Sequence, residues 1–206
     1  MSLPSAMRDW PRGGKNAGRR HVYRKHCIGH MEIITKRHWR GWNSNDETEA
    51  KWAERSAEEN IAVYAERLEQ LRPRLSQRNY RFFKNGLHDA RLISFATGDG
   101  LHIDFAKNGS VAINDFYRTS AEMKVLNAEF DAIYHLKYKG VSKSVFDFPS
   151  DDPLWGKNID DWGYDELSEV NETVLRHEVL FSSGTTILIE FEKFSFTKTK
   201  YNGSRY

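Results

Sequence analysis

The chain has 206 residues and a mass of 24.0 kDa, enough for one ordinary domain with a hydrophobic core. Hydrophobic residues make up 39% of it, and no uninterrupted apolar stretch is long enough to span a bilayer, so we expect a soluble chain without membrane contact. Its single cysteine, Cys27, excludes an intrachain disulfide and favours a reducing, cytoplasmic location.

The small net charge of +2 conceals an uneven distribution. Ten Lys and Arg residues stand against two acidic residues up to Asn45, whereas the rest of the chain is acidic. We interpret residues 1–30 as a flexible basic extension, because "MEIITKRHW" from Met31 has the character of a natural protein start. This basic arm could contact nucleic acid, but we consider nucleic-acid binding unlikely.

The same extension contains side chains that can bind zinc. A structural zinc site needs four ligands and usually paired cysteines, so the sequence predicts no metal site and no cofactor. The candidate ligands are His21, His26, Cys27 and His30.

Residues 31–86 form a predicted helical region. Ser44 or Asn45 is expected to cap a long amphipathic helix, and Pro73 to end it or to begin the next one. A second, shorter helix is predicted over "PRLSQRNYRFFKNG", with Gly86 as its left-handed stop. The expected apolar stripes contain Ala50, Ala53, Ala57, Ile61, Tyr64, Leu68 and Leu71 in the first helix, and Leu75, Phe82 and Phe83 in the second.

Residues 87–200 alternate between apolar and polar side chains, which predicts an antiparallel β domain. Turn signals at 98–100 and 108–109 indicate a β-meander, and Ser183-Gly184 indicates a closing hairpin. The alternation slips by one residue near Lys193, which predicts a β-bulge. The fold class we expect is α+β, with the N-terminal helices packed on an antiparallel β-sandwich or partly open barrel.

Residues 146–172 carry nine carboxylates against the single Lys157 and contain several aromatic side chains. We interpret this segment as an acidic aromatic loop, because carboxylates and aromatic faces both favour cationic ligands. It could serve as a binding surface or only as a solvated connection. Its candidate binding residues are Trp155, Trp162, Tyr164, Asp165 and Glu166.

The adjacent pair His88 and Asp89 is a further candidate binding position, at the expected start of a strand. Neighbouring side chains on a strand point to opposite faces, so the two are expected to diverge and to stabilise a turn. No serine, phosphate-loop or metal motif accompanies them, and we therefore assign no catalytic residue.

Four segments resemble a bacterial family of uncharacterised proteins that is known as a domain of unknown function. They are "MEIITKRHW" at 31–39, "LHDARLISF" at 87–95, "WGYDEL" at 162–167 and "HEVLFSSGTTILIEFEKFSF" at 177–196. The resemblance implies a helical region followed by a strand-rich domain. It implies no known activity, and it directs attention to the Leu-His-Asp and Trp-x-Tyr-Asp-Glu segments.

The favoured function is a non-catalytic cytoplasmic binding protein whose acidic aromatic loop meets a basic protein partner. One alternative is a small hydrolase in which His88 or His177 works with Asp89, Asp165 or Glu166 from separate strands. Another is nucleic-acid binding through the basic arm.

Overall fold

The structure is a computed structural model that describes residues 31–99, 102–105, 107–109, 111–114, 119–148 and 158–201; for 102–105 and 111–114 it describes the backbone only. Two compact units are present: the first ends at Val63 and the second begins at Tyr64. No helix in the described part of the chain is long and apolar enough to cross a membrane. The predicted zinc ligands and the basic extension lie outside the described residues.

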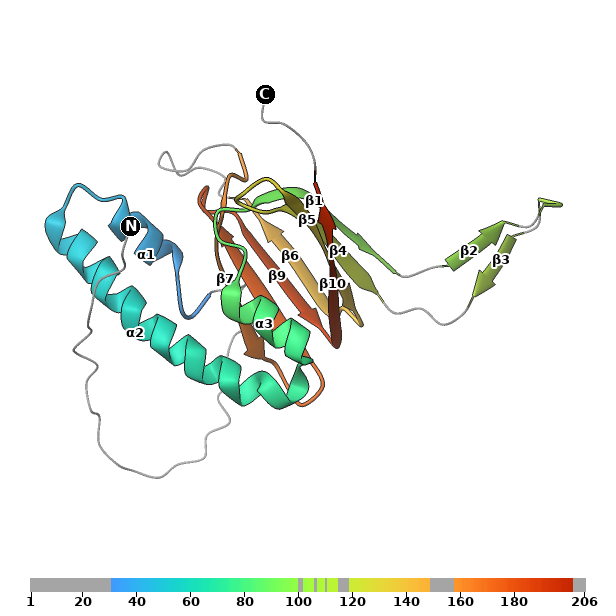
Figure 1. Cartoon of the computed structure of the whole chain (residues 1–206), viewed down its shortest axis with the longest axis horizontal. Helices are drawn as coiled ribbons and strands as arrows, with labels where there is room; N and C mark the ends of the chain where they lie inside the picture. The colour runs from blue at the N-terminus through green and yellow to red at the C-terminus, as the bar shows by residue number, and fades with distance from the viewer. Residues whose placement is uncertain are drawn as a thin grey trace. The chain divides into compact units, whose positions relative to one another are not determined.

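The first unit contains helix α1, Lys36–Trp42, and most of helix α2, Glu47–Leu71 (Figure 1). The two helices approach closely at Gly41, where an added Cβ would lie only 2.5 Å from the Cβ of Ala53. The cap of α2 differs from the expected Ser44 or Asn45. Asp46 Oδ1 accepts hydrogen bonds from the backbone amides of Thr48 and Glu49, at 2.7 and 3.4 Å.

Buried His38 is the polar centre of this unit. Its ring stacks on Trp52 with centroids 5.1 Å apart, and its Nε2 lies 2.7 Å from the Ser56 hydroxyl oxygen. Arg37 lies over the Trp52 ring at 3.8 Å. Burial, with a smaller effect from the Arg37 charge, lowers the pKa of His38 below its usual value.

The second unit begins inside α2, and the predicted apolar stripe is confirmed there by buried Leu68 and Leu71. A 3₁₀ turn, Arg72–Arg74, contains Pro73 and ends the helix as expected. Helix α3, Gln77–Asn85, begins later than predicted, because Ser76 caps it by accepting a hydrogen bond from the Asn79 amide. Gly86 follows α3 with a φ of 64°, which confirms the left-handed stop.

In the described part of the chain, ten antiparallel strands follow, which confirms the α+β class (Figure 1). One four-stranded sheet has the order β1-β4-β5-β10, the other has the order β6-β9-β8-β7, and β2 and β3 form a two-stranded sheet. Their bounds are Arg91–Gly98 (β1), His102–Phe105 (β2), Val111–Asn114 (β3), Ser120–Leu126 (β4), Ala132–Lys139 (β5), Lys143–Asp147 (β6), Trp162–Glu169 (β7), Leu175–Phe181 (β8), Thr186–Phe191 (β9) and Lys193–Lys200 (β10).

Two strand predictions need correction. The turn at 108–109 joins β2 and β3. The expected β-meander is wrong, because β1 pairs with β4 and not with β2, the next strand in the chain. The phase slip near Lys193 is not a bulge. At Glu192 the chain leaves β9 of one sheet and enters β10 of the other, so the apolar pattern restarts on a new surface. The hairpin at Ser183-Gly184 is confirmed between β8 and β9.

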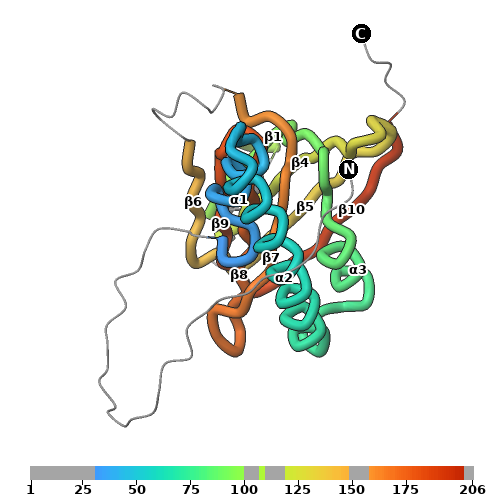
Figure 2. The backbone as a smooth tube through the Cα atoms, turned by 90° about the vertical axis from the view of Figure 1, so that its left-hand side faces the viewer, coloured from blue at the N-terminus to red at the C-terminus, as the bar shows by residue number. Residues whose placement is uncertain are grey.

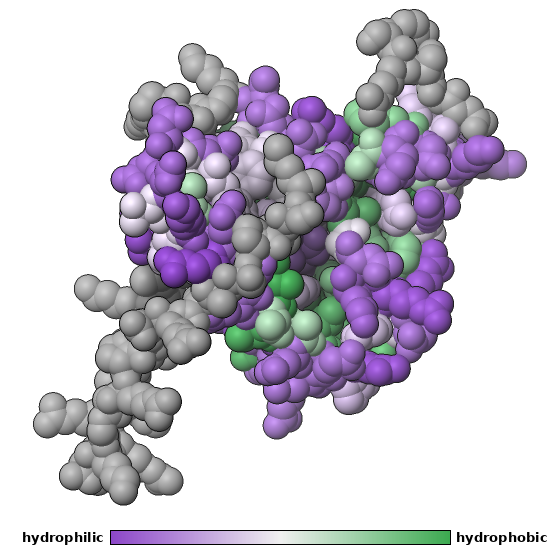
Figure 3. Space-filling view, turned by 60° about the vertical axis from the view of Figure 1, so that its left-hand side comes forward, coloured by the Kyte–Doolittle hydropathy of each residue, from purple (hydrophilic) through white to green (hydrophobic). Residues whose placement is uncertain are grey.

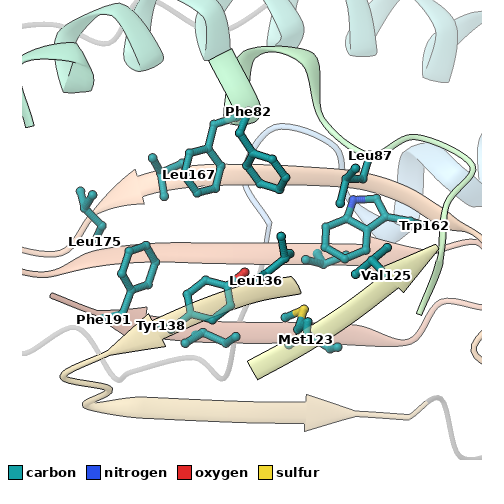
Figure 4. Close-up of a cluster of buried hydrophobic side chains, with 14 of the residues drawn as sticks. Phe82, Leu87, Met123, Val125, Leu136, Tyr138, Trp162, Leu167, Leu175 and Phe191 are labelled. Carbon is teal, nitrogen blue, oxygen red and sulfur yellow. The ribbon is translucent and has the colours of Figure 1, made fainter. Parts of the chain in front are cut away.

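One hydrophobic core lies between the two four-stranded sheets and takes side chains from both, as well as from α3 (Figure 4). Phe82 points from α3 toward the strands, and its ring centroid lies 4.7 Å from Phe196 and 5.3 Å from Phe194 on β10. Asn79 also donates a hydrogen bond to the Phe194 carbonyl, so α3 is fixed beside β10 (Figure 2). Burying each such aromatic side chain stabilises the fold by about 2 kcal/mol.

Hydrophilic residues cover most of the face in Figure 3. Within the described ranges, the large hydrophobic side chains with substantial exposure are Val63, Ile93, Phe148, Val170 and Tyr201.

The lowered pKa of His38 makes the first unit sensitive to acid. Between its usual pKa of 6.5 and its lower folded value, the unfolded chain binds a proton that the folded chain does not. We therefore expect the free energy of unfolding to fall as the pH drops through 6.5, and a His38→Gln variant to lose part of this dependence. Urea titrations at several pH values measure both. If the free energy of unfolding changed equally with pH in the wild type and in His38→Gln, His38 would not be the source of the acid sensitivity.

Candidate functional site

A bulge near the start of β7 places two polar side chains in the core. Trp162 pairs with Phe181 and Tyr164 with Leu180, so Gly163 is the extra residue. On a regular strand, residues three apart point to opposite faces. The bulge brings Trp162 and Asp165 to the same face, where the Trp162 indole Nε1–H donates to Asp165 Oδ1 at 2.9 Å.

The hydrogen bonds continue from Asp165 to the next strand and to the other sheet. His177 Nε2 on β8 lies 3.1 Å from Asp165 Oδ2, and His177 Nδ1 lies 2.7 Å from the Tyr138 hydroxyl oxygen on β5. Every group is satisfied when Nε2–H donates to the carboxylate and Nδ1 accepts from the hydroxyl. We call Trp162, Asp165, His177 and Tyr138 the buried polar chain. Figure 4 shows Trp162 and Tyr138 among the apolar side chains of the core.

Burial and the charge of Asp165 raise the pKa of two tyrosines, Tyr138 in the buried polar chain and Tyr64 near it. The pKa of Tyr138 is raised well above its usual value, first by burial and then by the Asp165 carboxylate. Tyr64 on α2 accepts a hydrogen bond from the Leu167 amide at 3.1 Å, and its pKa is raised by the same two causes. A phenol held neutral remains a hydrogen-bond donor, which preserves the contact of Tyr138 with His177 Nδ1.

Within the buried polar chain, His177 and Asp165 lie close enough to act as a histidine–carboxylate pair, but a substrate cannot reach them. His177 is fully buried, and both of its ring nitrogens are already used. A general base must reach the proton that it removes, directly or through one water. The pairing of His177 with Asp165, which is one of the pairs that the hydrolase alternative named, therefore exists as a structural element of the core.

The expected divergence of His88 and Asp89 is wrong. Both lie in a turn before β1, and Asp89 has a φ of 59°, so the opposite-face rule for strands does not apply. Instead, His88 Nδ1 lies 2.9 Å from Asp89 Oδ1, with both side chains exposed. The turn itself is confirmed, since the Ala90 amide donates to the Leu87 carbonyl at 3.0 Å.

Tyr164 lies against this turn because the bulge directs it away from the core. Its ring meets the His88 ring edge to face, with centroids 5.2 Å apart. Partial burial, followed by the charge of Asp89, raises the pKa of Tyr164. The structure therefore brings together three predicted site residues: His88 and Asp89 from the turn, and Tyr164 from β7.

Two further carboxylates border the same turn. Asp161 Oδ1 lies 2.6 Å from Arg91 Nε, and Asp160 Oδ1 lies 3.6 Å from Arg91 Nη1. Asp160, like Asp89, has a positive φ, at 58°. We call His88, Asp89, Asp160, Asp161 and Tyr164 the acidic turn surface.

The other predicted residues lie elsewhere. The acidic aromatic loop is only partly a loop, because residues 162–169 form β7, and Trp162 and Glu166 are buried. Glu166 lies opposite buried Glu178 in the β7–β8 register. Trp155 lies outside the described residues. Tyr138 was missed, although its place in the alternation of "YHLKYK" predicts an inward side chain, and a buried phenol usually needs a partner.

No cluster of three or more His, Cys, Asp or Glu side chains in the described ranges could hold a metal ion. Comparisons with protein-family models, with curated proteins and with solved structures gave no match. The resemblance to a bacterial family of unknown function therefore stays a prediction.

The buried polar chain can be tested at Tyr138. A Tyr138→Phe substitution leaves His177 Nδ1 without its partner in the core, which should lower the free energy of unfolding by about 1–3 kcal/mol. Tyr134→Phe is a matched control on the same strand, because Tyr134 is only half-buried, and it should change stability by about 0.5 kcal/mol or less. Urea unfolding measures both, and a loss for Tyr138→Phe of about 0.5 kcal/mol or less would contradict this role of the hydroxyl.

Proposed function

We propose that this chain is a non-catalytic binding protein whose acidic turn surface binds a basic protein partner. The surface carries three carboxylates, and the neighbouring Arg91 guanidinium offsets one of them, so these four groups have a net charge of −2. Such a surface attracts cationic partners over a distance of about 10 Å at moderate salt. It accelerates their association more than it strengthens the final complex.

The observation that carries the proposal is the backbone conformation of two of these aspartates. Asp89 and Asp160 are two of the three non-glycine residues with positive φ among the described residues, the third being Phe130. A positive φ costs a residue with a side chain roughly 1 kcal/mol, and such conformations concentrate at functional surfaces. Here the cost holds two carboxylates beside Arg91 and Tyr164, where a partner can reach them.

The hydrolase alternative has weaker support. Its buried pair, His177 and Asp165, is enclosed in the core, and His88 is left with Asp89 as an exposed dyad. An exposed dyad lacks the dry, low-dielectric surroundings in which enzymes stabilise developing charge. Nucleic-acid binding through residues 1–30 concerns a segment outside the described residues and stays a prediction. A cytoplasmic location remains part of the proposal and rests on the single cysteine.

The acidic turn surface can be neutralised without changing the backbone. Asn tolerates a positive φ as well as Asp does, so the double variant Asp89→Asn with Asp160→Asn removes two charges and keeps both turns. We expect its affinity for a fluorescent oligoarginine peptide to fall about tenfold, and the wild-type affinity to fall with added salt. Fluorescence anisotropy measures both.

A matched control removes two charges from α2, with Glu54→Gln and Glu59→Gln. It should change the affinity by about twofold or less, since neither glutamate belongs to the acidic turn surface. Equal losses in the two double variants would show that net charge alone attracts the peptide, and would contradict a specific surface.

A further inference from the structure

The β1-β4-β5-β10 sheet has an outer face, which is the side turned away from the hydrophobic core. Leu136 and Tyr138 on β5 are buried, so the alternating Lys137 and Lys139 point outward, and both are exposed. The strand registers place outward side chains of β4 and β10 beside them. We call the following residues the basic sheet face: Ser120, Glu122 and Lys124 on β4, His135, Lys137 and Lys139 on β5, and Lys193, Ser195 and Thr197 on β10.

This face carries an excess of positive charge. Its four lysines stand against one carboxylate, that of Glu122, so these five groups have a net charge of +3. Lys137 pairs with Glu122, with its Nζ 3.1 Å from Oε1. In the part of the chain that the structure describes, Lys124, Lys139 and Lys193 form no ion pair with a carboxylate. Most of the positive charge is therefore uncompensated.

Two of these lysines lie directly opposite each other. Lys139 of β5 pairs with Lys193 of β10 in the strand register, and both side chains are exposed. Like charges in opposite positions on neighbouring strands destabilise a sheet. The adjacent carboxylate, Glu192, already has an interaction within the chain, and it lies against Gly140, where an added Cβ would be 2.8 Å from its Cδ. An anion bound between the two ammonium groups would replace their repulsion with attraction.

We propose that the basic sheet face binds the phosphate backbone of double-stranded DNA without reading its base sequence. Lysine ammonium groups and Ser or Thr hydroxyls are among the side-chain groups that contact phosphate oxygens in protein–DNA complexes. The face presents both kinds side by side, since Ser120 lies opposite Lys139 and Ser195 lies opposite Lys137. Contacts of this kind release counterions from the DNA and therefore depend strongly on salt.

The composition of the face favours a phosphate backbone over an acidic protein or a membrane. Protein partners are held mainly by aromatic or arginine anchors, and membranes by apolar side chains that enter them. The basic sheet face contains no Phe, Tyr, Trp, Arg or aliphatic residue. Leu126 and Ile133 continue the outward rows at the end away from Lys139, and both are only partly exposed.

The same composition favours a DNA duplex over other nucleic acids. A single strand is bound largely by aromatic side chains on which its bases stack, and the face has none of these. Duplex RNA is recognised through 2′-hydroxyls in its minor groove. A flat sheet face does not enter a groove, and it can still contact the phosphates of DNA.

The basic sheet face shares no residue with the acidic turn surface. Binding of DNA and binding of a basic partner can therefore hold or fail separately. The face is also distinct from the basic extension at residues 1–30, which lies outside the described residues.

The test removes the two opposed lysines. In Lys139→Gln with Lys193→Gln, the affinity for a fluorescein-labelled DNA duplex of random sequence should fall at least tenfold at low salt. The plot of the logarithm of the association constant against that of the salt concentration should become shallower by about 1.8, because each lost phosphate contact removes about 0.9. Fluorescence anisotropy of the full chain at several salt concentrations measures both. Circular dichroism checks the fold, which should tolerate the loss of a like-charge pair.

The matched control is Lys198→Gln with Lys200→Gln, which removes the same charge from the same strand. Lys198 lies over the Tyr134 ring and Lys200 lies opposite buried Ala132, so neither belongs to the basic sheet face. The control should keep the salt dependence of the wild type.

Three results would overturn the proposal. The first is a wild type that does not bind the DNA duplex at low salt. The second is an equal change in the two double variants, which would show that net charge or the basic extension attracts the DNA. The third is tighter binding of the wild type to duplex RNA of the same length, or to an oligoglutamate peptide of the same charge, which would show that a different polyanion fits the face.

Discussion

The hydrogen bonds from Trp162 through Asp165 and His177 to Tyr138 constrain the rest of the second unit. They run through the hydrophobic core and connect β7 and β8 of one sheet to β5 of the other. A buried polar group without a partner costs about 1–3 kcal/mol, so each of the four side chains depends on its neighbour. The bulge at Gly163 follows from this requirement, because only an extra residue lets Trp162 and Asp165 share a face. Gly86 is constrained as well, since a Cβ there would lie 3.3 Å from Asp165 Oδ1.

The same hydrogen bonds decide which polar side chains lie in the core and which lie at the surface. The histidine and carboxylate that resemble catalytic groups are bound to one another inside the core, and the bulge turns Tyr164 outward to meet His88. Among the described residues, His88 and Asp89 keep their side chains exposed in the turn beside Tyr164. This turn is the surface that we propose for a basic partner.

The sequence allowed correct prediction of features that depend on local chemistry. The apolar stripe of α2, the break at Pro73, the stop at Gly86 and the hairpin at Ser183-Gly184 each depend on a few neighbouring residues. The α+β class followed from the change in apolar period near Leu87. These features need no knowledge of distant contacts.

Two of the errors share an origin, which is that long-range contacts decide burial and strand pairing. The acidic composition of residues 162–169 indicated a loop, but β8 pairs with this segment and draws Glu166 inward. The phase slip at Lys193 has the pattern of a bulge, yet it marks a crossing between sheets that only the tertiary structure reveals. For His88 and Asp89, the strand begins three residues later than assumed, at Arg91, so a rule for strands was applied to a turn.

The most direct test of this account is the exchange of the His177 Nε2 proton with solvent, followed by NMR on nitrogen-15-labelled protein. The buried polar chain predicts a proton on Nε2 that exchanges slowly enough to give a resolved signal, because His177 is fully buried and this proton is shared with Asp165. A proton that exchanges as fast as that of a surface histidine would contradict the account. It would show that solvent reaches His177 and that the pair with Asp165 is open to chemistry.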